Sequence, residues 1–439
     1  MLNRLKQFIP QPLLKLYHYS LAIAANFFYG SPSDKLIVIG VTGTSGKSTV
    51  VYLIAKMLQN AGFRVGAAST FLFKVDKKEW LNDKKMTMIG RFALQKLIKQ
   101  MTKANCQYAI IETSSQGIEQ FRHLGINYDI LIFTNLYPEH IEAHGNFENY
   151  KKAKLKLFAK LKEETIKILA NQKIKKTIIA NLDDEHAKDF LANWAQDKFG
   201  FTLTQQSSDQ GRVVRAENEV ISGSGVEFTV AGQPFNLKLF GRHNIYNTLA
   251  TVTLGLSQGL SLSKMSEILS AIQGVPGRIE FIEAGQPFKI IVDYAYEPKA
   301  VLALYEMVKL IDHKKVIHVL GSCGGGRDCW RRPVLGELAA KLADYVIVTN
   351  EDPYDEDPQR IIDQVAAGAI KAGKVNNKNL FSILDRRQGI SKALSLAQAG
   401  DLVLVSGKGC EPVMAVKDGK LIPWDDRQVV REELKNLKK

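Results

Sequence analysis

The stretch Ile39–Val50, IGVTGTSGKSTV, decides how the first half of the chain folds. It follows an apolar run and leads into a segment with the spacing of a helix. Its glycines allow backbone N–H groups to point inward, and the start of a helix adds a favourable dipole for a phosphate. The standard phosphate loop has a glycine where this chain has Val41, but the mechanism survives that change. We predict that Lys47 contacts the outer phosphates of a nucleotide and that Ser48 holds Mg²⁺.

Short β-branched runs alternate with helical patterns around this loop. Residues 35–43, 108–112 and 129–135 are short apolar runs, whereas residues 47–62 have the spacing of a helix that Gly62 closes. This alternation predicts an α/β fold in which helices cover a mostly parallel sheet. Residues 211–240 instead alternate apolar and polar side chains around AGQP, which predicts an antiparallel hairpin.

A second β/α series begins after Pro276. Its apolar runs are residues 289–295, 315–321, 345–350 and 401–407, with helical segments between them. We expect this part to form a Rossmann-like α/β domain. The predicted organisation is therefore a helical segment at 1–34, a central P-loop ATPase domain at 35–275 and a C-terminal domain at 276–439.

Composition narrows the class of protein. The 439 residues are 45% hydrophobic and 24% charged, as in a globular protein of two or three domains. The formal charge of +14 suits a nucleic-acid binder, a protein on an anionic membrane or an enzyme with polyanionic substrates. The lysines are spread along the chain, so charge alone decides nothing. The cysteines have no metal-site spacing, which fits a reducing cytoplasm. They are Cys106, Cys323, Cys329 and Cys410.

Residues 13–29, LLKLYHYSLAIAANFFY, are apolar and aromatic but are interrupted by polar side chains. The segment is too short to span a bilayer comfortably. A signal peptide is conceivable, but an ATP-binding sequence follows almost at once. We interpret the segment as a helix packed on the body of the protein, with an amphipathic helix on the membrane surface as the alternative.

Two further segments supply candidate metal ligands. Glu112 ends the run YAIIE, where its carboxylate can lie beside the phosphates. Residues 133–158, FTNLYPEHIEAHGNFENYKKAKLKLF, place Asn135, His140 and His144 ahead of a lysine-rich helix. Together with the loop at 43–48, these segments resemble the Mur ligase family, most closely the members that add the third amino acid to the peptidoglycan precursor.

The resemblance runs from about residue 36 to the C-terminus, and its motifs follow the order of the family. They are GTSGKST at 43–49, ETSSQGIEQFR at 112–122, GRHNIYN at 241–247, GVPGRIE at 274–280, VDYAYEP at 292–298, GGGRD at 324–328, VTNEDPYDEDP at 348–358 and SGKGCE at 406–411. The resemblance implies a central ATP-binding domain and a C-terminal ligase domain.

The resemblance also implies roles for individual residues. Nucleotide contacts are implied for Gly43, Thr44, Ser45, Gly46, Lys47, Ser48, Thr49, Asn135, His243, Asn247, Arg278 and Asp293. Of these, Asn247 and His243 would line the adenine pocket, and Asp293 would take the ribose hydroxyls. Mg²⁺ ligands are implied at Ser48, Glu112, His140 and a carbamylated Lys154, and the catalytic group is Lys47, Glu112, His140 and Lys154. Substrate contacts are implied at Thr87, Ser114, Ser115, Gln120, Arg122, Arg327, Glu351, Asp352, Gly407 and Glu411.

The reaction that the family implies is the formation of an amide bond driven by ATP. The γ-phosphoryl group passes to a substrate carboxylate, and an amine attacks the resulting acyl phosphate. Mg²⁺ and Lys47 offset the charge on the phosphoryl group, so catalysis is mainly positioning and electrostatics. The partners are then a muropeptide-type acceptor and an amino acid, in the cytoplasm.

The chain differs from the family in two regions: the one that would bind the UDP end of the acceptor and the one that would bind the incoming amino acid. Full-length members carry an N-terminal domain that grips the UDP end of the precursor, whereas only a helix-sized segment precedes the loop here. A lipid-linked acceptor, with contact between the first helix and the inner face of the membrane, or a partner subunit would account for this difference. Tyr354 replaces the arginine of diaminopimelate-adding members, which favours a cationic amine such as lysine unless Arg327, Arg331 or Arg332 substitutes. Smaller changes are Gln116, Glu139, Tyr296 and Cys410.

Two other readings stay open. One keeps the chemistry but changes the acceptor to a folate-polyglutamate or a poly-amino acid. The other is a non-catalytic, nucleotide-regulated protein that binds polyanions, which predicts a salt-sensitive interaction and no amine-dependent release of ADP. We expect no nucleic-acid partner, because the sequence lacks the interleaved aromatic and basic residues of single-strand binders.

Overall fold

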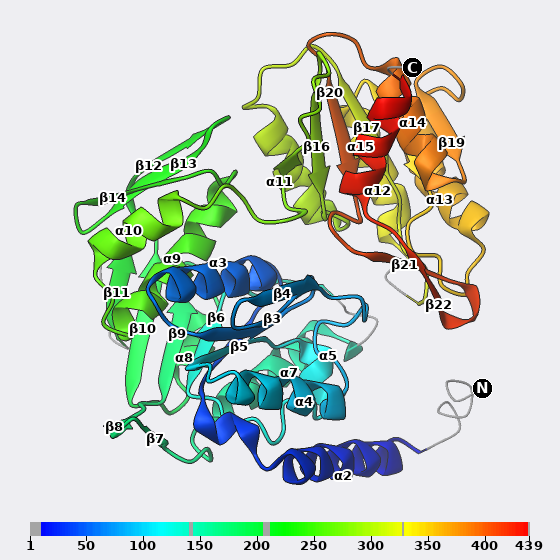
Figure 1. Cartoon of the computed structure of the whole chain (residues 1–439). Helices are drawn as coiled ribbons and strands as arrows, with labels where there is room; N and C mark the ends of the chain where they lie inside the picture. The colour runs from blue at the N-terminus through cyan, green and yellow to red at the C-terminus, as the bar shows by residue number, and fades with distance from the viewer. Residues whose placement is uncertain (1–9, 140–143, 205–210, 327–328, 438–439) are drawn as a thin grey trace. The chain divides into compact units, whose positions relative to one another are not determined.

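The computed structural model describes residues 10–139, 144–204, 211–326 and 329–437. The chain forms two compact units. Unit 1 comprises Met1–Glu219, Glu227–Asn236 and Arg242–Ala271, and unit 2 comprises Val220–Val226, Leu237–Gly241 and Ile272–Lys439. Figure 1 shows the elements of both units, which are described one at a time below.

Unit 1 is built on a nine-stranded sheet with the strand order β11-β10-β9-β6-β1-β5-β2-β3-β4. Its strands are β1 (Ile37–Thr42), β2 (Val65–Ala68), β3 (Leu72–Val75), β4 (Lys78–Leu81), β5 (Tyr108–Glu112), β6 (Ile130–Phe133), β9 (Thr177–Asn181), β10 (Asp197–Thr202) and β11 (Arg212–Arg215). β1 pairs in parallel with both β5 and β6, and only the β2–β3 and β3–β4 pairs are antiparallel. The predicted mostly parallel α/β sheet is confirmed.

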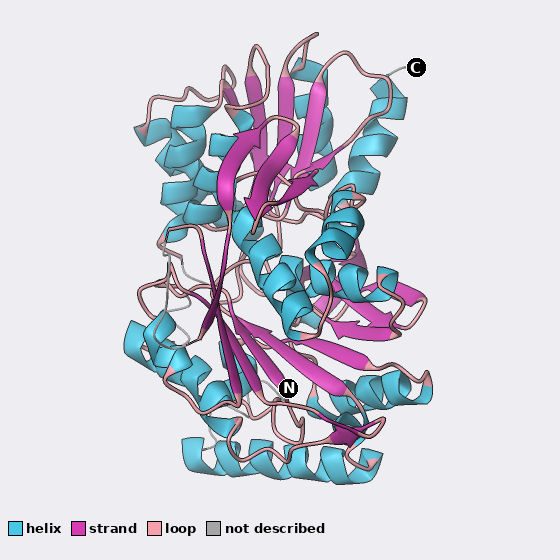
Figure 2. Cartoon of the chain, turned by 90° about the vertical axis from the view of Figure 1, so that its left-hand side faces the viewer, coloured by secondary structure: helices cyan, strands magenta, loops and turns pink. Residues whose placement is uncertain are grey.

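Helices cover both faces of this sheet (Figures 1 and 2). They are α2 (Gln11–Tyr29), α3 (Lys47–Asn60), α4 (Arg91–Lys103), α5 (Ser115–Glu119), α7 (Phe147–Lys160), α8 (Ala187–Leu191), α9 (Arg242–Ser257) and α10 (Leu262–Ser270). Apolar side chains of α4, α5, α7 and α8 form one continuous core with the sheet, and α3 packs against α9 and α10. The central strands β5 and β6 are buried along their whole length, which explains why they read as unbroken apolar runs.

The predicted N-terminal helix is confirmed as α2. It packs against α4, where the rings of Phe28 and Tyr29 contact Phe92, and Ala22 and Ala25 are buried. Gly30, with φ of 70°, ends the helix in a left-handed cap, and its N–H and that of Ser31 satisfy helix carbonyls. Among the described helices, none combines the length and apolarity needed to cross a membrane.

A small sheet divides its residues between the two units. It has the order β12-β13-β14, with β12 at Glu217–Ser222, β13 at Gly225–Val230 and β14 at Gln233–Leu237. The two residues Ala231 and Gly232 join β13 to β14, a connection that only an antiparallel pair can have. This pair is the hairpin that the sequence predicted. The short strands β7 (Ile168–Leu169) and β8 (Gln172–Lys173) form a separate antiparallel pair.

Unit 2 has a six-stranded sheet with the order β15-β16-β20-β17-β18-β19. Its strands are β15 (Glu280–Phe281), β16 (Lys289–Asp293), β17 (Val316–Leu320), β18 (Tyr345–Thr349), β19 (Leu380–Ile383) and β20 (Leu402–Ser406). All pairs are parallel except β15–β16, as expected of a Rossmann-like sheet. The hairpin β21 (Val413–Val416) and β22 (Lys420–Pro423) had no prediction.

The helices of unit 2 close two apolar cores, one on each side of the sheet. They are α11 (Pro298–Val308), α12 (Arg331–Leu342), α13 (Pro358–Lys371), α14 (Arg386–Leu396) and α15 (Asp426–Leu437). α11, α12 and α13 contribute to one core, and α14 and α15 to the other. The carboxyl ends of the parallel strands therefore meet along one edge, where such folds bind ligands.

Candidate functional site

The phosphate loop of unit 1 connects β1 to α3 and needs glycine at two positions. Gly46 caps α3 with φ of 79°, and a Cβ there would lie 2.4 Å from Oδ1 of Asn247. A Cβ on Gly43 would lie 1.9 Å from Oγ1 of Thr134. Neither position has room for a side chain, because neighbouring elements press against the loop. The backbone N–H groups at the start of α3 are thus presented at the carboxyl edge of the sheet.

The end of β6 holds the loop from the side. The N–H of Thr44 donates to the backbone oxygen of Asn135 at 2.8 Å, and the N–H of Ser45 donates to its Oδ1 at 2.9 Å. The hydroxyl of Thr134 donates to the carbonyl of Ser45 at 2.8 Å. Asn135, which the resemblance assigned to the nucleotide, therefore contacts the loop backbone here and positions the loop.

Ser48 and Glu112 come together beside the loop. The Ser48 hydroxyl donates to Oε2 of Glu112 at 2.8 Å, and Glu112 is only 2% exposed. The same carboxylate accepts from the N–H of Thr70 at 2.7 Å and from its hydroxyl at 2.9 Å. Lys47 donates to the carbonyl of Thr44 at 2.9 Å, and Thr49 is buried in the first turn of α3.

Lys154 on α7 contacts the same phosphate loop. Its Nζ donates to the carbonyl of Gly43 at 2.7 Å and lies 4.5 Å from the centre of the Tyr150 ring. The side chain is 1% exposed, and burial holds the pKa of Lys154 well below its usual value, with the charge of Lys47 acting in the same direction. The ammonium form of Lys154 is therefore less favourable here than in water. His140, its expected companion in the metal site, lies outside the described residues.

The adenine-contacting candidates lie on α9. Asn247 is buried beside Gly46 and donates to Oδ1 of Asn244 at 2.9 Å. His243 is exposed and faces Asn244, with 3.3 Å between Nε2 and Nδ2. One turn along, the Tyr246 hydroxyl donates to Asp183 at 3.0 Å. The structure thus brings Asn247 to the loop and leaves His243 at the protein surface.

The acceptor candidates surround the short helix α5. Ser114 caps α5 and accepts from the N–H of Gly117 at 3.2 Å, and the Ser115 hydroxyl lies 3.0 Å from Nε2 of His144. Thr87 lies 3.0 Å from the hydroxyl of Thr70 and so joins the Glu112 network. Of the acceptor candidates, Thr87 is thus linked through Thr70 to Glu112 and Ser48, whereas Ser114 and Ser115 bond to Gly117 and His144.

Two guanidinium groups lie at the far end of α5. Arg122 donates to Oε1 of Gln120 at 2.6 Å and to the carbonyl of Met88, and Arg91 donates to the carbonyl of Gln120. Burial lowers the pKa of Arg122 to about 10, and the neighbouring charge of Arg91 adds to this effect. Among the described residues neither guanidinium has a carboxylate ion pair, and two close cations of this kind form a site suited to an anionic group.

In unit 2, Asp293 at the end of β16 organises the backbone around it. Its oxygens accept from the N–H groups of Ile279 at 2.8 Å and Ala295 at 2.6 Å. Burial raises the pKa of Asp293, and the nearby Arg278 opposes this. The guanidinium of Arg278 lies 4.5 Å from the centre of the Tyr294 ring. Asp293 and Arg278, which the resemblance assigned to ribose and phosphate, are thus neighbours.

The amino-acid candidates of unit 2 gather around a buried lysine. Nζ of Lys408 donates to Oδ1 of Asp352 at 3.0 Å and to Oε2 of Glu411 at 2.7 Å. Glu351 is buried beside Gly407, where a Cβ would lie 2.4 Å from its Oε2, an oxygen with no hydrogen-bond partner among the described residues. Burial raises the pKa of Glu351, against the opposing effect of Arg386. Arg327 lies outside the described residues.

Several contacts were missed from the sequence. Thr70 follows β2, which pairs in parallel with β5, so the rule that carboxyl ends share an edge could have found it beside Glu112. Asp183 and Asp184 follow β9 in the same way, and Asp184 accepts from the N–H of Leu136 at 2.7 Å. Lys408 stands inside the quoted SGKGCE motif. Arg91 had no signal, since an arginine at the start of a helix is commonplace.

The residues of unit 1 fit a nucleotide and Mg²⁺. A hydroxyl and a carboxylate lie 2.8 Å apart at a loop from which a Cβ is excluded at two positions. Hard cations such as Mg²⁺ prefer oxygen ligands of this kind, and phosphates bind at the N-terminus of a helix. Among the described residues, which do not include His140, no group of three or more His, Cys, Asp and Glu side chains could hold a metal ion.

Comparison with known proteins agrees with this geometry. Residues 41–255 match the Mur ligase middle domain, and residues 277–409 match the Mur ligase glutamate ligase domain. The chain is 35% identical to UDP-N-acetylmuramyl-tripeptide synthetase of Roseiflexus sp. strain RS-1, over 98% of this chain and 85% of that protein. It is 32% identical to a UDP-N-acetylmuramoyl-L-alanyl-D-glutamate–2,6-diaminopimelate ligase of Bacillus cereus, over 97% of this chain and 84% of that protein.

A solved structure supports the same assignment. It is that of a UDP-N-acetylmuramoyl-L-alanyl-D-glutamate–2,6-diaminopimelate ligase, which is 28% identical, has a TM-score of 0.59 and aligns with 92% of this chain and 79% of its own. The match to the middle domain contains the phosphate loop of unit 1, and the match to the glutamate ligase domain contains Asp293 and Lys408 of unit 2. The chain therefore belongs to the Mur ligase family, whose members are ATP-dependent ligases.

Proposed function

We propose that this protein uses ATP to join an amino acid to the peptide of a peptidoglycan precursor. The observation that carries the proposal is the convergence of Ser48, Glu112 and Lys154 on the phosphate loop, in a chain 35% identical to a tripeptide synthetase. The proposed reaction has two steps. A carboxylate oxygen of the acceptor bonds to the γ-phosphorus and ADP leaves; the amine nitrogen then bonds to the acyl carbon, phosphate leaves and the amine loses a proton.

The loop residues would bind and orient the nucleotide. Lys47, half-buried in the first turn of α3, would contact the outer phosphates, and Ser48 with Glu112 would hold Mg²⁺. Bound Mg²⁺ supplies positive charge that offsets the charge of the phosphoryl group. Asn135 and Thr134 would keep the loop in the conformation that receives the phosphates, because they already bond to its backbone.

Lys154 would act as a metal ligand after carbamylation. An ammonium repels a cation, but the carbamate formed from a neutral amine and CO₂ is an anion with two oxygen ligands. The depressed pKa of Lys154 favours the neutral amine that this reaction needs, and the proton released goes to solvent. Its position, with Nζ 2.7 Å from the carbonyl of Gly43, lies at the phosphate loop. His140 stays a proposed ligand.

The two substrates would bind in different units. Arg122 and Gln120, with Arg91 beside them, would hold an anionic group of the muropeptide acceptor. The unpartnered oxygen of Glu351 would accept a hydrogen bond from an amino group of the incoming amino acid. We propose a diamino acid such as lysine, since Tyr354 occupies the place of an arginine that would bind a distal carboxylate.

The acceptor is proposed to be UDP-linked or lipid-linked, and a partner subunit is proposed only for the lipid-linked case. We place the reaction in the cytoplasm, where ATP is available. A folate or poly-amino-acid acceptor is the alternative within the same chemistry, but no contact of the described residues favours it. If the protein is instead a non-catalytic, nucleotide-regulated protein that binds polyanions, no amine should cause the release of ADP.

The test is release of ADP and phosphate from ATP across a panel of amino acids, with UDP-linked and lipid-linked muropeptide acceptors. We expect release to require one amino acid and one acceptor, and product masses to show one new amide. Glu112→Gln should abolish turnover, whereas Lys56→Ala, a half-buried position on α3 that pairs with Glu79, should leave it unchanged. Absence of amine-dependent release with every acceptor would contradict the proposal.

A further inference from the structure

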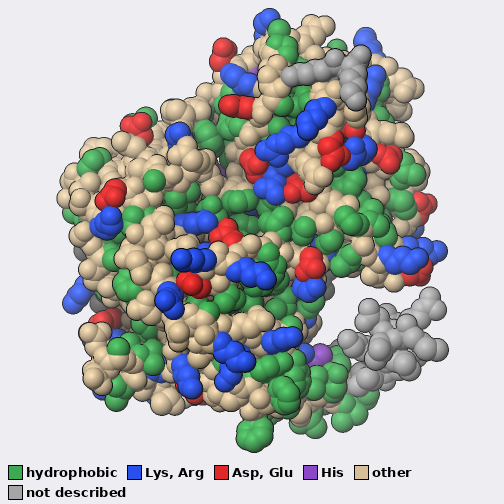
Figure 3. All heavy atoms as spheres, viewed as in Figure 1, with side chains coloured by type: hydrophobic (Ala, Val, Ile, Leu, Met, Phe, Trp, Pro, Cys, Tyr) green, Lys and Arg blue, Asp and Glu red, His purple; other side chains and the backbone are tan. Residues whose placement is uncertain are grey.

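The outward face of α2 is apolar, which is unusual for a helix on a protein surface. Phe27 and Phe28 near its end are 87% and 72% exposed. Further exposed apolar or aromatic residues of α2 are Leu13, Leu16, Tyr17, Tyr19 and Ile23. Lys15 is the single charged residue in the helix, and no acidic residue is present. Figure 3 shows these hydrophobic side chains at the lower edge of the molecule. A continuous apolar patch of this kind marks an interaction surface.

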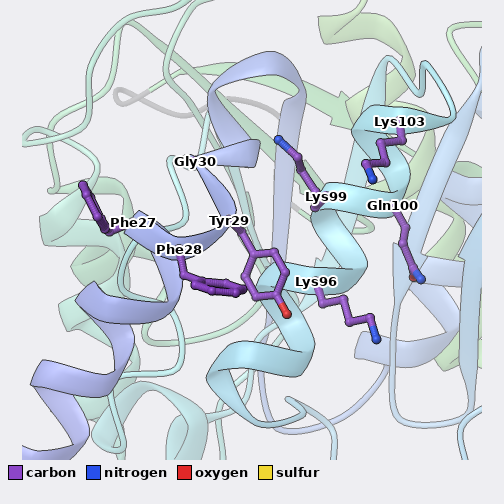
Figure 4. A pocket seen from close by; sticks show the side chains of 8 residues that line it. All are labelled: Phe27, Phe28, Tyr29, Gly30, Lys96, Lys99, Gln100 and Lys103. Carbon is purple, nitrogen blue, oxygen red and sulfur yellow. The ribbon is translucent and has the colours of Figure 1, made fainter.

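A row of lysines on α4 borders this face. The lysines are Lys96, Lys99 and Lys103, spaced so that they lie on one side of α4. With Phe27, Phe28 and Tyr29 they line a pocket of about 480 Å³ (Figure 4). Among the described residues, none of the three ammonium groups has a carboxylate partner within ion-pairing distance. The surface therefore combines exposed aromatic rings with unneutralised positive charge.

A purely structural role accounts for only part of this arrangement. Nζ of Lys99 lies 4.0 Å from where a Cβ of Gly30 would be, so it faces the C-terminal end of α2 and interacts favourably with the helix dipole. Lys103 lies in the last turn of α4, near the carboxyl end of its own helix, whereas Lys96 has no such position among the described residues. The Phe28 ring lies 6.2 Å from the Phe92 ring of α4, centre to centre, yet Phe28 stays 72% exposed and Phe27 87% exposed.

We propose that the α2–α4 face, defined as the exposed residues of α2 together with Lys96, Lys99 and Lys103, docks on an anionic phospholipid bilayer. α2 lies in the plane of the interface with its aromatic side chains among the acyl chains and headgroups. The lysines of α4 then face the lipid phosphates, whose charge complements theirs. A helix with an apolar outer face, no acidic residue and a basic neighbour fits a lipid surface better than it fits water.

Docking would also bring the acceptor candidates to the membrane. The ring of Tyr19 on α2 packs edge-on against Phe121 with 5.9 Å between centroids, and Phe121 lies between Gln120 and Arg122. A Cβ on Gly125 would lie 2.5 Å from Asn26, so α2 and the acceptor loop are in close contact. The bilayer would thus hold this loop where a lipid-linked acceptor is presented; that consequence alone rests on the proposed function.

The test is co-sedimentation of the full chain with vesicles, without substrate. Vesicles of phosphatidylcholine alone are compared with vesicles that also contain phosphatidylglycerol, at low and at high salt. We expect binding to the anionic vesicles, with weaker binding at high salt. The triple variant Lys96→Gln/Lys99→Gln/Lys103→Gln should bind about a hundredfold more weakly, since each lysine near such a surface contributes about fivefold. Phe27→Ser/Phe28→Ser should bind at least about tenfold more weakly.

Matched controls separate this surface from charge and hydrophobicity in general. Lys173→Gln/Lys188→Gln/Lys417→Gln removes equal charge from exposed positions elsewhere, and Ile168→Ser/Leu421→Ser removes exposed apolar side chains. Both should bind as the parent does. Ligation with a UDP-linked acceptor should be the same in all variants, so a failed ligase assay leaves the binding result intact. Equal binding of parent and α2–α4 variants, or binding to neither vesicle, would overturn the proposal, as would a dimer that Phe27→Ser/Phe28→Ser dissociates.

Discussion

At the scale of single residues, Lys154 connects the fold to the proposed chemistry. The Lys154 side chain is 1% exposed, and the positive charge of Lys47 acts on it. The folded chain therefore disfavours the ammonium form of Lys154. Between the lowered pKa of Lys154 in the folded chain and the usual lysine pKa, the unfolded chain binds a proton at this position that the folded chain does not bind. Folding then becomes more favourable as pH rises toward that value, and the dependence ends above it.

This linkage gives a prediction for Lys154→Met in CO₂-free buffer. The free energy of unfolding of the parent should rise relative to that of the variant as pH rises toward the usual lysine pKa of about 10.4, with a limiting slope of about 1.4 kcal/mol per pH unit. Urea unfolding at several pH values measures this difference. Lys152→Met, an exposed position on α7, should show the slope of the parent. A Lys154→Met slope equal to that of the parent would show that the lysine is charged in the folded protein.

A second prediction concerns Gly46. Gly46→Ala adds a Cβ 2.4 Å from Oδ1 of Asn247 and places alanine at φ of 79°. We expect a loss of about 2 to 4 kcal/mol in the free energy of unfolding and loss of nucleotide binding. Gly62→Ala is the matched control, since its φ is 99° but no atom lies within 4 Å of the added Cβ. It should lose only the backbone term of about 1 to 2 kcal/mol. Equal losses would mean that Asn247 moves aside freely.

The sequence predicted the residues of the loop better than their contacts. Lys47, Ser48 and Glu112 could be found because glycine spacing and strand ends leave a local pattern. The contacts of Asn135 with the loop could not, because they depend on the pairing of β1 with β6, which brings together residues 90 apart in the chain. The assignment of roles to these residues stays a prediction.

At the scale of elements, the position of Lys154 depends on how α7 begins. Asn146 caps α7, and its side-chain oxygen accepts from the N–H of Asn149 at 2.8 Å. Asn146→Ala should lower the free energy of unfolding by about 1 kcal/mol, because it leaves a helix N–H without a partner. Thermal unfolding measures the change. Asn146→Asp retains the acceptor and should be nearly neutral, and a similar loss in both variants would assign the effect to another contact.

A buried ion pair joins two helices of unit 2. Nη2 of Arg386 at the start of α14 donates to Oδ2 of Asp426 at the start of α15 at 2.7 Å, and both side chains are almost fully buried. Arg386→Met leaves a buried carboxylate without its cation, so we expect a loss of about 3 to 5 kcal/mol in the free energy of unfolding. Urea unfolding measures it. Arg386→Met/Asp426→Leu should recover most of the loss; if it does not, shape and not charge is what the pair provides.

Elements were predicted where periodicity was strong. The strands β5, β6, β16, β17, β18 and β20 and the helix α3 coincide with apolar runs and helical spacing in the sequence. The edge strand β4 was missed because KEWL is partly exposed and carries no continuous apolar run, and its buried neighbour β3, LFKV, is only four residues long. The apolar outer face of α2 was visible only in the structure, since the sequence does not say which side of a helix packs against a neighbour.

At the scale of the whole molecule, nucleotide binding should act on stability through unit 1. With Mg²⁺ and ATP at about 100 times the dissociation constant, the free energy of unfolding of unit 1 should rise by about 2.7 kcal/mol. Removing Mg²⁺ with a chelator, or Glu112→Gln, should reduce the rise. Hydrogen exchange with mass spectrometry should locate the added protection in β1, α3 and β5. Protection confined to unit 2 would contradict the assignment of the phosphate loop.

The attachment of the phosphate loop to β6 has a consequence for kinetics. Hydrogen bonds from Thr44, Ser45 and Thr134 already fix the loop before any ligand arrives. A preorganised loop loses little conformational entropy when the ligand binds. Association of the triphosphate should therefore be limited by diffusion and not by a conformational change. The association rate constant of the triphosphate should therefore fall in proportion to solvent viscosity, as expected for diffusion-controlled binding to a preformed site.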